Sequence, residues 1–61
     1  MTITLGTYRA TVGTWPDRIV TDVTDAMVTF HFPDAPDRTI TLTPADFGVW
    51  VYIAQARRDG E

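Results

Sequence analysis

Turn-forming residues divide the chain before Thr43 into short segments, and this limits the folds open to it. Breaks fall at 13–17, 25–26 and 33–37, where Gly, Pro and Asp gather. Between the breaks, β-branched and aromatic residues alternate with polar ones, a pattern typical of strands. We therefore predict four strands, at about residues 2–12, 18–24, 27–32 and 38–42.

The clearest alternation lies in the third segment, where Val28, Phe30 and Phe32 point to one side and form its inward face. In the second segment Ile19 and Val23 share one face, and Val20 lies on the other. The first segment changes phase at 6–7, which predicts a β-bulge or a tight turn there.

The C-terminal segment carries the signals of a helix. Thr43 is a favoured N-cap residue, Pro44 suits the first helical position, and Asp46 adds a favourable charge to the first turn. Good helix formers continue to Arg58, and Gly60 is a candidate C-cap. We predict a helix over about 44–58, although residues 49–53 also have high strand propensity. The predicted fold is α+β, a small antiparallel β-meander of about four strands with one C-terminal α-helix packed on a face; the alternative is an all-β small barrel.

On the predicted C-terminal helix, apolar residues cover a sector of the circumference about twice as wide as a surface helix needs. A stripe of a little over ~100° is enough for one contact face. One side of the helix is expected to pack on its own sheet. The opposite side is either covered by a sheet that curls around the helix, leaving Tyr52 at the rim, or it contacts another chain. We favour the contact with another chain, because interfaces are enriched in Trp and Tyr. The candidate interface residues are Val49, Trp50, Tyr52 and Ile53, with Trp15 as either a lid on the core or an exposed anchor.

The composition argues against catalysis and against a covalent or metal staple. The 61 residues include no Cys, Ser, Lys or Asn, so most covalent nucleophiles are missing, and Thr, Tyr and carboxylates remain. A chain this short buries only ~60% of its unfolded surface, so a partner would stabilise it. The bias towards Ala, Val, Thr, Asp and Arg is typical of GC-rich genomes, such as those of actinobacteria and their phages. We expect no enzymatic activity and no cofactor.

Three weaker patterns have simpler interpretations. His31, Asp34 and Asp37 have a spacing compatible with a metal site, but Asp is also a favoured turn residue, and we predict no metal. Arg9, Arg18 and Arg38 lie among acidic residues, so no basic patch for nucleic acid is expected. Seven aspartates in a chain of net charge −3 leave nucleic-acid mimicry as a minor alternative.

These observations predict a non-enzymatic protein–protein interaction module, most simply a self-associating structural or accessory protein that forms a homo-oligomer. A small monomeric binder or inhibitor of a larger host protein is the alternative. No apolar run approaches the ~20 residues that a membrane span needs, and no signal peptide is visible, so a cytoplasmic or virion-associated location is expected.

Overall fold

A computed structural model describes residues 3–59 and confirms an antiparallel meander with one helix near the C-terminus. Its strands are short, and a fifth strand follows the helix. The elements are β1 (Gly6–Arg9), β2 (Arg18–Val23), β3 (Val28–His31), β4 (Ile40–Leu42), α1 (Pro44–Ala54) and β5 (Arg57–Arg58).

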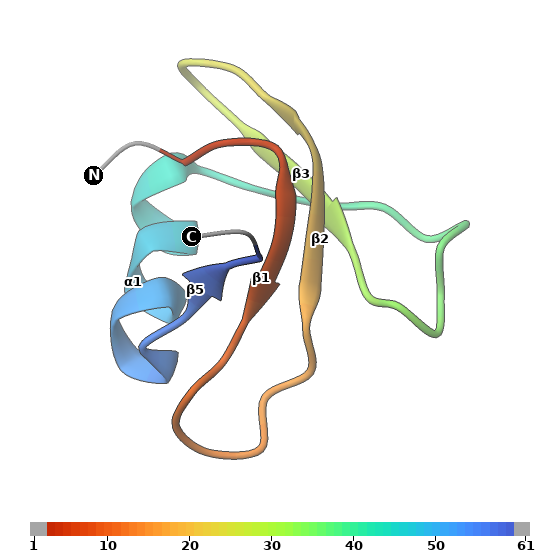
Figure 1. Cartoon of the computed structure of the whole chain (residues 1–61). Coiled ribbons are helices and arrows are strands. Elements are labelled where there is room, and N and C mark those ends of the chain that lie inside the picture. Colours follow the sequence, from red (N-terminus) through yellow and green to blue (C-terminus); the bar gives the residue numbers. More distant parts are fainter. Residues whose placement is uncertain (1–2, 60–61) are drawn as a thin grey trace.

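The five strands form one antiparallel sheet in the order β4-β3-β2-β1-β5. The first four strands follow one another as a meander, and α1 then carries the chain back across one face of the sheet to the other edge (Figure 1). There β5 pairs with β1, placing Tyr8 opposite Arg58. The backbone N–H of Asp59 also donates to the carbonyl of Thr7 at 2.7 Å.

The start of the helix follows the prediction. The backbone N–H of Asp46 donates to the side-chain oxygen of Thr43 at 3.2 Å, which satisfies one of the free N–H groups of the first turn. Pro44 occupies the first turn, where its missing N–H costs nothing.

The predicted end of the helix is wrong, because the helix stops at Ala54 and does not reach residue 58. Gln55 adopts the left-handed conformation, with φ 46° and ψ 48°. The backbone N–H of Gln55 donates to the carbonyl of Tyr52, and that of Ala56 donates to the carbonyl of Val51 at 2.9 Å. These two bonds close the last turn of the helix. Residues 57–58 therefore become a strand, and the arginines that seemed suited to a helix end pair with β1 instead. The predicted Gly60 cap lies outside the described residues.

The predicted irregularity at residues 6–7 falls where β1 begins, since Leu5 forms a bend and Gly6 has a φ of 131°. β1 itself is limited to residues 6–9, and a register shift that the sequence did not predict lies in β2, between Val20 and Asp22. The extra residue turns Val20 and Val23 to the same side, so Val20 is buried and Val23 packs against the core. The expectation that Val20 and Val23 lie on opposite faces of the strand is therefore wrong.

The core lies between the sheet and α1. Its buried residues come from the N-terminal segment, the inner face of the sheet and one side of the helix: Ile3, Tyr8, Val20, Val28, Phe30, Phe47, Trp50, Val51 and Ala54. Phe47 makes edge-to-face contacts with Tyr8 and Phe30, with ring centroids 5.4 and 5.5 Å apart. This aromatic contact joins α1 to β1 and β3.

Candidate interaction surface

One side of α1 faces away from the sheet and carries large apolar side chains. Val49 is 60% exposed, Tyr52 82% and Ile53 48%. Their spacing of three and four residues places them on one helical face. We call these three residues the outer face of α1. They are three of the five interface candidates predicted from the sequence.

Trp50, the fourth candidate, belongs to the core. It is 4% exposed, and its ring centroid lies 5.5 Å from that of Phe47. Its position on the helix places it at the border of the buried side, where an aromatic ring gains more by covering Phe47 than by facing solvent. The prediction that Trp50 lies on the surface is wrong for this reason.

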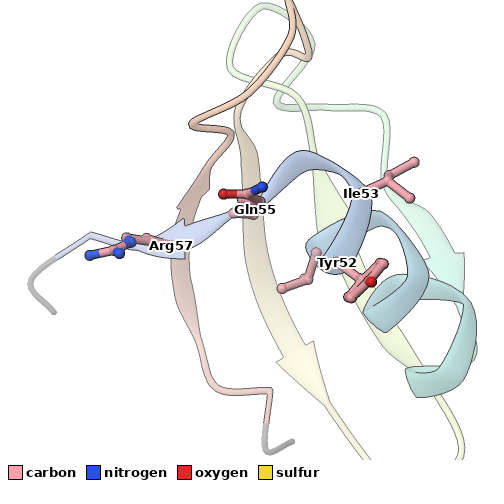
Figure 2. Close-up of a pocket in the computed structure, with 6 residues that line it drawn as sticks. Tyr52, Ile53, Gln55 and Arg57 are labelled. Carbon is pink, nitrogen blue, oxygen red and sulfur yellow. The ribbon is translucent and has the colours of Figure 1, made fainter.

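An open groove of about 670 Å³ lies beside the outer face, at the end of α1 (Figure 2). Its lining residues are Val51, Tyr52, Ile53, Gln55, Ala56 and Arg57. The left-handed turn at Gln55 produces the groove, because it directs the chain away from the helix axis into β5. Sequence reasoning missed the groove, since it continued the helix through these residues.

The loop after β1 is anchored to the same end of the helix. The N–H groups of Thr11 and Val12 both donate to the carbonyl of Ala54, at 3.0 and 3.2 Å. The hydroxyl of Thr11 donates to the carbonyl of Gln55 at 2.8 Å. These bonds satisfy carbonyl groups that the helix end leaves without partners, and they hold the backbone of the groove in place.

Trp15, the fifth candidate, lies further along this loop and is 44% exposed. Its indole ring packs close to Gly13, where an added Cβ would lie 3.1 Å from the ring nitrogen. Gly13 has a φ of 78°, a conformation that glycine adopts readily. Trp15 is not among the residues that line the groove.

Arg18 is an unexpected member of the core region. It stands opposite the buried Tyr8 on the inner side of the sheet, and its guanidinium carbon lies 4.2 Å from the ring centroid of Trp50 and 4.8 Å from that of Phe30. The rings of Phe32 and Phe47 each lie at 5.9 Å. Sequence reasoning treated Arg18 as a surface charge at the start of a strand.

Three polar atoms of this aromatic cage have no hydrogen-bond acceptor among residues 3–59. They are Nε and Nη1 of Arg18 and the indole nitrogen of Trp50, all of them buried. Burial lowers the pKa of Arg18 below its usual value, because the charged form loses solvation. The ring faces offset part of this loss through cation–π attraction.

Charge is distributed unevenly over the molecule. Arg9 forms ion pairs with Asp17 at 3.6 Å and with Asp59 at 3.5 Å. The helix itself contains one charged residue, Asp46 in its first turn. The outer face of α1 therefore presents an uncharged apolar surface on a chain of net charge −3.

Other features carry no site. Within residues 3–59 no group of His and acidic residues is arranged to hold a metal ion. That part of the chain also contains no helix with the length and hydrophobicity needed to cross a membrane. No protein-family model, curated protein or solved structure matches this sequence.

Proposed function

We propose that this protein is a non-enzymatic interaction module that associates with a second copy of itself through the outer face of α1. The observation that supports this most directly is the exposure of Val49, Tyr52 and Ile53 beside an open groove. Contiguous apolar groups of this kind on a small protein typically mark a contact surface.

A second copy suits this surface for two reasons. The projecting side chain of Tyr52 and the groove lie next to each other, so a two-fold arrangement lets each copy insert a tyrosine into the groove of the other. The outer face is also uncharged, so two chains that repel at long range meet there without placing like charges in contact, and Arg57 is the one charged residue that lines the groove.

A dimer interface of standard size needs more surface than Tyr52 alone can supply. A standard interface takes about 800 Å² from each partner, which is about a fifth of the 4166 Å² surface of this protein. A fully buried tyrosine supplies about 150–250 Å² of this area. The groove and the outer face together therefore have to take part, with Tyr52 as the central contact.

The test is the mass in solution, measured by light scattering on a size-exclusion column over a hundredfold range of concentration. We expect Tyr52→Glu to raise the dissociation constant at least about tenfold, because it places a charge at the centre of the contact. Met27→Glu is the matched control, since Met27 is also exposed but lies on the β2–β3 turn. An unchanged mass for Tyr52→Glu would contradict this mode of association.

The exposed Trp15 supports a second candidate, a monomeric protein that binds a larger partner. Tryptophan is enriched among the residues that dominate binding energy, and Trp15 lies outside the groove. Two results together would favour this candidate over self-association. The wild type would be a monomer at every concentration, and a pull-down from a host lysate would recover one dominant protein with the wild type but not with Trp15→Ala.

A further inference from the structure

The outer edge of β4 is a second surface without a partner, distinct from the outer face of α1. β4 is the last strand in the sheet order and pairs only with β3 among the described residues. Proteins usually protect such an edge by keeping the strand short, or with a charge, a proline, a bulge or a covering segment. β4 is short, at three residues. Residues 39–43, Thr-Ile-Thr-Leu-Thr, contain no charge and no proline.

The hydrogen-bond pattern shows which groups of β4 face outwards. The N–H of Thr24 donates to the carbonyl of Met27 at 2.8 Å, which fixes the alternation along β3, the strand of this pair whose register is unbroken. By this alternation Val28 and Phe30 direct their backbone groups towards β4, where they meet Leu42 and Ile40. The N–H and C=O of Thr41 therefore point away from the sheet.

The sequence of this edge is complementary to itself in the antiparallel direction. Pairing centred on Thr41 places Thr41 opposite its copy and Ile40 opposite Leu42 of the other chain. Ile40 and Leu42 both pack against the core, so the pairing would extend the apolar inner side of the sheet from one chain to the next. The outer side would carry Thr–Thr pairs, which are favourable between strands.

The charges at the two ends of the edge also match. In the same register Arg38 lies opposite Pro44 of the other copy, next to the first helical turn that contains Asp46. Arg38 and Asp46 are both exposed, and neither has an ion-pair partner among residues 3–59. The two-fold symmetry would produce the contact twice.

We propose that β4 pairs with β4 of a second copy about a two-fold axis at Thr41, so that two five-stranded sheets become one continuous sheet. This contact is independent of the outer face of α1. A chain with two self-complementary surfaces can assemble beyond a dimer, whereas either surface alone gives a dimer.

Thr41→Pro tests the pairing directly. Proline removes the outward N–H, while the bonds of β4 to β3 are made by Ile40 and Leu42 and remain. The variant is measured together with Tyr52→Glu, so that only the β4 edge is left for self-association. We expect Tyr52→Glu alone to remain a dimer, and the double variant to be a folded monomer. Thr41→Val, which keeps the N–H, is the matched control and should remain a dimer in the same background.

Charge reversal gives a second test that does not alter the strand. Arg38→Asp and Asp46→Arg should each raise the dissociation constant roughly tenfold in the Tyr52→Glu background, and together they should restore it. Circular dichroism checks that each variant keeps its fold. A Tyr52→Glu protein that is monomeric up to about 1 mM would overturn the β4 pairing and leave the α1 contact intact. The β4 pairing would also be overturned if neither Thr41→Pro nor charge reversal changed the dissociation constant of the Tyr52→Glu dimer.

Discussion

Replacing Arg18 with methionine tests how the aromatic cage contributes to stability. The guanidinium gains cation–π attraction from Trp50 and Phe30, the two nearest rings, worth about 0.5–1 kcal/mol each and up to ~2 when desolvated. Against this, Nε and Nη1 are buried with no acceptor in the part of the chain that the structure describes, and each unsatisfied donor costs about 1–3 kcal/mol. At mid-range values the cost of burial is the larger quantity, so we expect the charge to destabilise the fold on balance.

We therefore expect Arg18→Met to raise the free energy of unfolding by about 1 kcal/mol, because methionine keeps apolar contact with the rings and removes the unpaired donors. For a domain of this size the increase corresponds to ~4–8 °C in Tm. Arg18→Ala should lower the free energy by about 2–3 kcal/mol, since it also removes the side-chain stem that covers the rings. Urea unfolding at fixed protein concentration, followed by circular dichroism, measures both.

Arg9→Met is the matched control, because Arg9 is exposed and its ion pairs with Asp17 and Asp59 are at the surface. Its effect should remain below about 1 kcal/mol. If Arg18→Met lowers the free energy of unfolding by more than about 1 kcal/mol, the cation–π attraction outweighs the burial cost and the reasoning is refuted.

Three further substitutions are read by the same unfolding assay. Gln55→Gly should raise the free energy of unfolding by about 1 kcal/mol, since Gln55 holds a left-handed conformation that glycine adopts without strain; a loss of stability would show that the Gln55 side chain is needed. Gly48→Ala should add a similar amount, because a Cβ there meets no atom within 4 Å and alanine favours the helix; a loss would indicate an unseen close contact. Phe47→Ala should cost about 3–5 kcal/mol and leave little structure by circular dichroism, because Phe47 is fully buried; a folded variant would show that the core collapses around the gap.

The start of the helix could be predicted because its signals are local. Thr43, Pro44 and Asp46 each act within one turn, and their effects do not depend on the rest of the fold. The inward face of β3 could be predicted for a similar reason, since the alternation of Val28 and Phe30 survives in any sheet with one buried side.

The end of the helix could not be predicted because distant contacts decide it. Residues 54–58 favour a helix by propensity, but β1 offers them a strand partner, and Thr11 and Val12 take the free carbonyl of Ala54. These contacts join positions more than forty residues apart, and tertiary pairing overrides a weak local preference.

The position of Arg18 and the division of the helix could not be predicted for another reason. A charged residue at the start of a strand ordinarily remains in solvent, and only the arrangement of four rings makes its burial tolerable. On a helix that is apolar over most of its circumference, the pattern does not show which residues face the sheet. Trp50 and Tyr52 are both interface candidates by sequence, yet one is buried and the other is the most exposed large apolar residue of the described chain.

The two proposed contacts lead to one prediction about stability that does not depend on any substitution. Arg18, Gln55 and Gly48 each cost the isolated chain free energy, in a domain whose stability should be only roughly 3–9 kcal/mol. Association of folded chains offsets such costs by mass action. Either contact alone gives a dimer that unfolds to two chains, for which a tenfold rise in concentration adds about 1.4 kcal/mol per dimer, or ~0.7 kcal/mol per chain. The Tm should therefore rise by ~3–5 °C for each tenfold increase in protein concentration, and the Tyr52→Glu, Thr41→Pro variant should lose this dependence. A wild-type Tm that is constant over a hundredfold range would show that the folded chain is stable alone and that neither contact contributes to its stability.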